Sequence, residues 1–136
     1  MTSEPIVFIP GFMCDARAFL PQIVQLGADH ACQVILPSGE ETIERLSEKV
    51  LASTPEKFVL VGHGLGGDVA MDVLRRVPER VLRVVLISTD PLAEPPKAAA
   101  AREARIVAAK AGRLVQAAAE DYPDAAFAQT EWRDEV

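Results

Sequence analysis

The stretch that decides the fold is GHGLGG, residues 62–67. The apolar run from Phe58 to Val61 precedes it and has the length and residue types of a buried strand. Behind the stretch, apolar residues recur at helical spacing from Val69 to Val77, until Pro78 stops the pattern. The glycines therefore form a tight turn from a strand into a helix.

This turn has three interpretations, which the hexapeptide alone does not separate. Gly62, Gly64 and Gly67 have the G-x-G-x-x-G spacing of a dinucleotide-binding fingerprint. The turn also fits G-x-S-x-G, the nucleophile elbow, with Gly64 in place of the serine. The third interpretation is a plain tight turn whose small residues let the strand and the helix approach closely.

Outward from the turn, strand and helix signals alternate. Helical spacing predicts helices over about 17–28 and, with Thr42 as the N-cap, from Ile43 to Leu51. Alternating strands and helices pair in parallel through right-handed crossovers, so we expect an α/β fold with three layers around a mainly parallel sheet. The apolar, β-branched runs predict strands at 6–9, 32–36, 58–61 and 81–87.

The composition changes after Pro91, where three prolines within six residues make a stiff connection. The alanine-rich sequence beyond them predicts a helix over about 97–111 and, after a break at Gly112, a second one over about 113–120. Residues 122–136 have too little pattern to be assigned. We therefore divide the chain into a core segment, 1–92, and a helical segment with a tail, 93–136.

Composition narrows the function classes. The chain has 136 residues, 49% of them hydrophobic, and a net charge of −6. The acidic balance predicts neither nucleic acid nor a membrane as partner, because both carry negative charge. There is no signal-peptide pattern, and Cys14 and Cys32 set no disulfide framework, so we expect a cytoplasmic protein. The sequence has no cluster of His, Cys, Asp or Glu residues at the spacing of metal ligands, so we expect no metal site. We also expect no cofactor.

The flanking segments favour the elbow over the dinucleotide fingerprint. A fingerprint of that kind normally follows the first strand of its unit, whereas this turn follows the third predicted strand. The first strand instead ends in Pro10-Gly11-Phe12. Acyl transfer needs a backbone N–H from such a loop, beside the N–H of the residue after the nucleophile. Loops at the carboxyl ends of adjacent parallel strands supply such a pair.

Three segments together resemble the α/β-hydrolase family of bacterial esterase-type enzymes. They are IPGFMCDAR at 9–17, FVLVGHGLGG at 58–67 and RRVPERV at 75–81. The segment from Val84 to Arg113 also resembles the start of the cap of that family. The resemblance covers nearly the whole chain. It implies an ancestral hydrolysis of a small acyl ester by a serine nucleophile.

The resemblance also implies roles for single residues. It places the oxyanion-binding N–H groups on Phe12 and Leu65. It places Gly62, His63 and Gly66 in the elbow, around the nucleophile position, Gly64. His63 precedes that position and is interpreted as a packing residue rather than the catalytic base.

Two departures from the family pattern predict a chain that is inactive or very weak. Gly64 stands where the family has serine, as expected of a natural pseudo-enzyme or an engineered trap. The family also continues through strands that carry the acid and the histidine of the triad, and the chain ends before them. Asp90 is where a minority of these enzymes place the acid, but we interpret it as a turn former before Pro91. His30 is interpreted as a surface residue.

Two other hypotheses stay open. One is a non-catalytic module that binds a small ligand or a partner through the retained pocket. The other is a dinucleotide-binding domain that uses Gly62, Gly64 and Gly67. They differ in the ligand that each predicts, an ester or acid for the first and NAD or FAD for the second.

The predicted strand order is second, first, third, fourth, by analogy with the family. That order leaves the strand from Val81 to Ile87 as an exposed apolar edge, which templates pairing with another chain. We expect association through this edge, either with a second copy of the chain or with a complementing C-terminal fragment.

Overall fold

The computed structural model describes residues 3–121. The chain divides into two compact units, Met1–Pro91 and Leu92–Val136.

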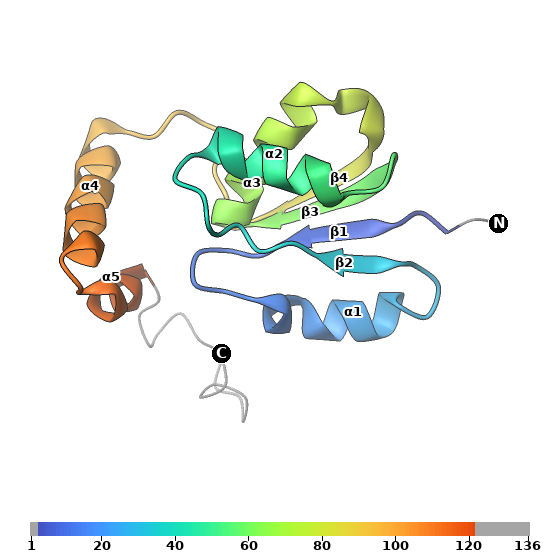
Figure 1. Ribbon diagram of the computed structural model, residues 1–136, viewed down its shortest axis with the longest axis horizontal. Helices are drawn as coiled ribbons and strands as arrows, with labels where there is room; N and C mark the ends of the chain where they lie inside the picture. The colour runs from blue at the N-terminus through green and yellow to red at the C-terminus, as the bar shows by residue number, and fades with distance from the viewer. Residues whose placement is uncertain (1–2, 122–136) are drawn as a thin grey trace. The chain divides into compact units, whose positions relative to one another are not determined.

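The first unit is built on a sheet of four parallel strands (Figure 1). Its order is β2-β1-β3-β4, which confirms the predicted order. The strands are β1 (Ile6–Ile9), β2 (Cys32–Val34), β3 (Phe58–His63) and β4 (Val81–Ile87).

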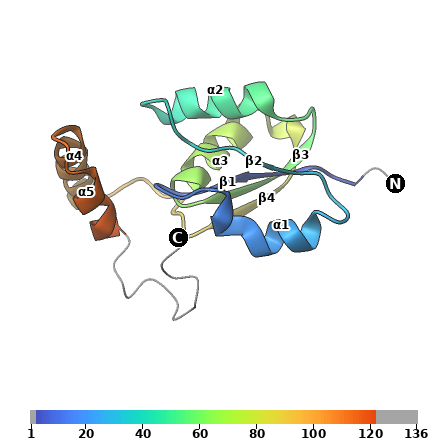
Figure 2. The ribbon, with the colours of Figure 1, turned by 60° about the horizontal axis from the view of Figure 1, so that its bottom comes forward.

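Helices cover both faces of this sheet, which gives the three layers that the sequence predicts (Figure 2). A 3₁₀ turn, η1 (Ala16–Phe19), and helix α1 (Leu20–Leu26) lie on one face. Helices α2 (Ile43–Ser53) and α3 (Leu65–Arg76) lie on the other face. A short 3₁₀ turn, η2 (Pro78–Arg80), leads from α3 into β4.

Strand β1 lies at the centre of the core because all four of its side chains are buried. Ile6 and Phe8 pack on the α1 side, where the rings of Phe8 and Phe19 lie 4.9 Å apart. Val7 and Ile9 pack on the α2 and α3 side. The sequence of a strand that is buried on both faces is typically a continuous apolar run, and this strand has such a sequence. Each such side chain stabilises the fold by about 1.5–3 kcal/mol.

The predicted and observed bounds differ for several elements, among them the first helix and the second strand. The helix predicted over 17–28 begins as a 3₁₀ turn and ends at Leu26. The Asp15 side chain caps this turn, since it accepts a hydrogen bond from the backbone N–H of Arg17 at 2.9 Å. Strand β2 is shorter than predicted, although the Ile35 N–H still bonds to the Phe8 carbonyl at 2.9 Å.

The predicted cap of the second helix is confirmed. Thr42 has extended backbone angles, and its Oγ1 accepts a hydrogen bond from the Arg45 N–H at 3.3 Å. Satisfying this N–H is worth about 1 kcal/mol to the helix.

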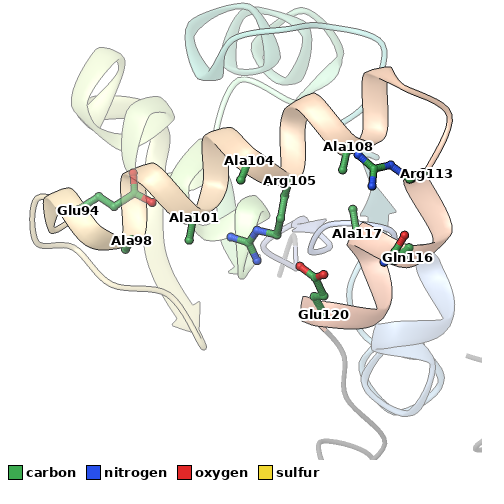
Figure 3. Close-up of a pocket in the computed structure, with 10 residues that line it drawn as sticks. All are labelled: Glu94, Ala98, Ala101, Ala104, Arg105, Ala108, Arg113, Gln116, Ala117 and Glu120. Carbon is green, nitrogen blue, oxygen red and sulfur yellow. The ribbon is translucent and has the colours of Figure 1, made fainter.

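The second unit contains α4 (Pro96–Lys110) and α5 (Leu114–Asp121). Gly112, at φ +83°, separates them, as the sequence predicts. Alanines form the wall of α4 that faces a groove between the two helices (Figure 3). Of the side chains described in this unit, only that of Ala117 is buried, so the unit has almost no core of its own.

Candidate functional site

The glycine turn joins β3 to α3 through one residue in a left-handed conformation. Gly64 has φ +54° and ψ −121°, a combination that disfavours residues with a Cβ. Its N–H donates to the Ile87 carbonyl of β4 at 3.0 Å. Its own carbonyl accepts a hydrogen bond from the Gly67 N–H at 2.8 Å. Hydrogen bonds to β4 and to the first turn of α3 thus hold the turn in place.

The glycines around position 64 are required by packing. A Cβ on Gly62 would lie 2.5 Å from the Gly66 carbonyl oxygen. A Cβ on Gly66 would lie 2.0 Å from the Ile9 carbonyl oxygen, and one on Gly67 would lie 2.5 Å from the Thr89 side chain. These contacts are too short for real Cβ atoms, so the close packing of strand and helix explains all three glycines.

Position 64 is different because it has room for a side chain. A Cβ built there would have one non-neighbouring atom within 4 Å, the Gly11 Cα at an ordinary 3.7 Å. Gly64 is therefore favoured by its backbone angles alone, whereas its three glycine neighbours are favoured by lack of space. This is the geometry that a nucleophile elbow needs at its central residue.

The loop after β1 lies beside this turn. Ile9 pairs with Gly62 across the sheet, and the first turn of α3 touches the Ile9 and Pro10 carbonyls at Gly66. Gly11 follows directly, and its carbonyl accepts a hydrogen bond from the Cys14 N–H at 3.1 Å. The structure thus brings the loop of Phe12 together with the elbow, at the carboxyl ends of two adjacent strands.

The N–H of Leu65 opens α3, a helix of 12 residues. Among residues 3–121, it donates no hydrogen bond. The first N–H groups of a helix have no partner within it, and they carry the partial positive charge of the helix dipole. This N–H is suited to bind a negatively charged oxygen next to position 64.

His63 packs against the loop after β1. A Cβ on Gly11 would lie 2.8 Å from His63 Nδ1, so the ring leaves no space for a side chain there. Nδ1 is buried and has no hydrogen-bond partner within the described part of the chain. The ring therefore fixes the position of Gly11, and with it the loop that carries Phe12.

Asp90 and His30 lie outside this cluster. Asp90 is exposed and follows β4 by three residues. His30 lies at the amino end of the sheet, where its Nδ1 is 2.8 Å from the Glu4 carbonyl oxygen. His30, which is expected at the surface, has a half-buried ring, and its Nδ1 contact joins the turn before β2 to the segment before β1.

Two residues that follow β4 also contact or flank the glycine turn, and no sequence pattern marks them. Thr89 Oγ1 donates to Asp68 Oδ1 at 3.2 Å, and the Thr89 side chain packs on Gly67. Ser88 has φ +49°. No local pattern marks these positions, because their partners lie on α3, about twenty residues earlier in the chain.

The structure shows no group of three or more His, Cys, Asp or Glu residues arranged to hold a metal ion, as far as residues 3–121 are concerned. Over the same residues, no helix combines the length and the apolar character needed to cross a membrane.

Two relatives are similar to parts of the chain. A pimeloyl-[acyl-carrier protein] methyl ester esterase of Aromatoleum aromaticum is 44% identical over 55 residues, 40% of this chain and 22% of that protein. A putative non-heme haloperoxidase of Mycobacterium phage D29 is 28% identical over 102 residues, 63% of this chain and 36% of that protein. The chain thus spans between a fifth and two fifths of the length of these relatives. No protein-family model matches it.

Two solved structures, an esterase and an epoxide hydrolase, have the same fold as this chain. A thermophilic esterase from Thermogutta terrifontis superposes with a TM-score of 0.60 at 26% identity, over 76% of this chain and 42% of that one. An epoxide hydrolase of Bacillus megaterium superposes with a TM-score of 0.57 at 19% identity, over 64% of this chain and 36% of that one. The predicted fold class, a parallel sheet between helices of the α/β-hydrolase type, is therefore confirmed.

Proposed function

We propose that this chain carries the elbow and the oxyanion loop of an esterase-type α/β-hydrolase whose nucleophile position is occupied by Gly64. In this proposal the site binds a small ester or carboxylic acid but does not form a covalent acyl intermediate. One observation carries the proposal, namely the room at position 64. A side chain fits there without a clash, at φ +54°, beside the Leu65 N–H.

The chemistry follows from the position of these groups. In a serine esterase, Oγ attacks the carbonyl carbon, and the resulting oxyanion accepts hydrogen bonds from two backbone N–H groups. Phe12 and Leu65 are the residues that we assign to this role. With glycine at position 64, no Oγ is present and the covalent step is lost. Losing the serine alone costs a factor on the order of 10⁶ in a serine protease.

The similarity to named esterases supports the acyl-ester substrate class. One relative is a methyl ester esterase, and one structural neighbour is an esterase. The identity in the first case is 44% over 55 residues, which is less than half of this chain.

The first test is ligand binding by the unchanged protein. Butyrate is a suitable probe, because its carboxylate resembles the acid product of ester cleavage. Titration with butyrate should shift the backbone amide resonances of Leu65 and Phe12 in ¹⁵N-labelled protein, and NAD should not. A thermal shift with NAD and no amide shifts with butyrate would instead favour the dinucleotide hypothesis for Gly62, Gly64 and Gly67.

The second test restores the nucleophile. Gly64→Ser should release p-nitrophenol from p-nitrophenyl butyrate when a C-terminal fragment of a related esterase is added, since that fragment supplies a histidine and an acid. Gly64→Ala is the matched control, because it has the same backbone strain and no hydroxyl. Equal p-nitrophenol release from both variants would contradict the assignment of position 64.

A further inference from the structure

Ser88 adopts a backbone conformation that its side chain disfavours. It directly follows β4 and has φ +49°. Met13, at φ +58°, is the other non-glycine residue with positive φ within residues 3–121. Both lie in loops at the carboxyl ends of strands next to β3, one on each side of the glycine elbow. Strained residues of this kind cluster at active sites and ligand-binding loops.

The neighbours of Ser88 hold it in place on the elbow. On one side, the Ile87 carbonyl accepts the Gly64 N–H at 3.0 Å. On the other side, Thr89 packs on Gly67, and its Oγ1 donates to Asp68 Oδ1 at 3.2 Å. Ser88 is thus fixed between two contacts, one to the elbow residue and one to the first turn of α3. A strained conformation persists only where the surrounding structure determines it in this way.

The Ser88 side chain makes no contribution to the fold that explains the strain. The residue is exposed, and its hydroxyl forms no hydrogen bond with any other residue that the structure describes. Glycine would adopt the same φ without strain. A serine at this position therefore suggests that the hydroxyl forms its hydrogen bond with a bound ligand.

We propose that Ser88 is a ligand-contacting residue of the elbow site, and that its hydroxyl donates a hydrogen bond to the bound carboxylate or ester. This inference rests on the proposed function, because it assigns a further polar contact to the same ligand. It also supplies a hydroxyl at the edge of a site whose central residue, Gly64, has none. The Ser88 hydroxyl binds the ligand without attacking it, so no bond is made or broken.

The test compares butyrate affinity across variants of the full chain by the same amide titration. Ser88→Ala removes the hydroxyl and keeps the strain, and we expect affinity to fall about fivefold, the factor that corresponds to one neutral hydrogen bond. Ser88→Gly should weaken binding equally without lowering the melting temperature. Ser88→Asn should retain most of the affinity, because asparagine tolerates positive φ and its amide donates.

Ser3→Ala is the matched control, since Ser3 is an exposed serine near the amino end of the sheet. It should bind butyrate as the unchanged protein does. Unchanged affinity in Ser88→Ala overturns the role of Ser88 and leaves the proposed function standing. An absence of butyrate binding by the unchanged protein overturns the proposed function, and this inference with it.

Discussion

The Cβ of an alanine would have room at position 64 but would clash at position 66. At Gly64 it would contact only the Gly11 Cα, at 3.7 Å, whereas at Gly66 it would lie 2.0 Å from the Ile9 carbonyl oxygen. Gly64→Ala should therefore lower the free energy of unfolding by about 1–3 kcal/mol, through backbone strain alone. Gly66→Ala should cost more, because β1 and α3 must move apart. Urea denaturation measures both values.

Gly112→Ala controls for the strain. Gly112 has φ +83° and no atom within 4 Å of a built Cβ, so its cost should resemble that of Gly64→Ala. If Gly64→Ala proved as disruptive as Gly66→Ala, position 64 would not have the room that the proposed function requires.

Asp72 is the acidic residue whose protonation should matter most for stability. Its side chain is 11% exposed and accepts hydrogen bonds from Arg75 at 2.6 Å and from Arg76 at 2.7 Å. Burial alone would raise the pKa of this carboxyl group. Hydrogen bonds from Arg75 and Arg76, together with the charge of Arg76, outweigh burial and hold the pKa below its ordinary value.

The sign of the pH dependence follows from this lowered pKa. As the pH falls, the unfolded chain takes up the proton first, near the ordinary aspartate pKa of about 3.9. The stabilisation by Asp72 is therefore complete above that pH and is lost as the pH falls through the lower folded-state pKa. Asp72→Asn should be less stable than the unchanged protein at pH 7, and the difference should shrink between about pH 4 and lower values. Urea denaturation at several pH values measures it, and a constant difference would contradict the prediction.

Single residues were predictable where their partners are close in sequence. Thr42 as a cap and the glycine turn from β3 into α3 both follow from patterns within a few positions. The bond of His30 to Glu4 spans 26 residues, and that of Thr89 to Asp68 spans 21. No local periodicity encodes such separations, so neither bond is predictable from the sequence.

At the scale of elements, Arg80 joins the loop before β3 to the turn before β4. Its guanidinium group donates to the carbonyls of Thr54, Pro55 and Glu56, and it lies 5.6 Å from the centre of the Phe58 ring. Arg80→Ala leaves these carbonyls without their donor. It should lower the free energy of unfolding by about 1–3 kcal/mol, as measured by urea denaturation.

Arg83→Ala is the matched control for Arg80→Ala. Arg83 pairs with Glu4 at 2.6 Å, but its side chain is 70% exposed. An exposed ion pair contributes about 0–1 kcal/mol, so this change should be nearly neutral. Equal effects of the two substitutions on the free energy of unfolding would show that the contacts of Arg80 with these carbonyls do not stabilise the fold.

Strand β4 is the element whose association can be tested. Within the described residues it pairs with β3 alone, and most of its apolar side chains are exposed. Val85→Lys places a charge on this edge and should reduce concentration-dependent association, as measured by sedimentation velocity. Val24→Lys on α1 changes the net charge equally and should leave association as it is. An unchanged protein that stays monomeric at high concentration would contradict the prediction.

Strands β1, β3 and β4 followed from sequence because each is a mostly apolar run, helices α2 and α3 because each has an apolar face, and α4 because alanine favours helix. Their ends followed less well. The helix after the first strand starts as a 3₁₀ turn capped by Asp15, and neither the turn type nor the side-chain bond leaves a trace in the hydrophobic pattern.

At the scale of the whole molecule, the stability resides in the first unit. All buried hydrophobic residues in the described part of the chain, other than Ala117, belong to Met1–Pro91. A chain that ends at Pro91 should therefore fold with a melting temperature within a few degrees of the full chain. Circular dichroism melting checks this, and an unfolded fragment would show that the second unit is needed for the core.

The strand order β2-β1-β3-β4 was predicted through the family resemblance, since alternating strands and helices alone are compatible with several orders. How the elbow, the first loop and the end of β4 meet was not predictable in detail. These contacts depend on the twist and spacing of strands that the chain forms only when folded.

The space left beside Gly64 also has a genetic consequence. A single base change converts some glycine codons into serine codons. The surrounding structure accommodates either residue, at the cost of one strained backbone conformation. Under the proposed function, one base change is therefore enough to restore the nucleophile, and attack on an ester then needs only the histidine and the acid that activate it.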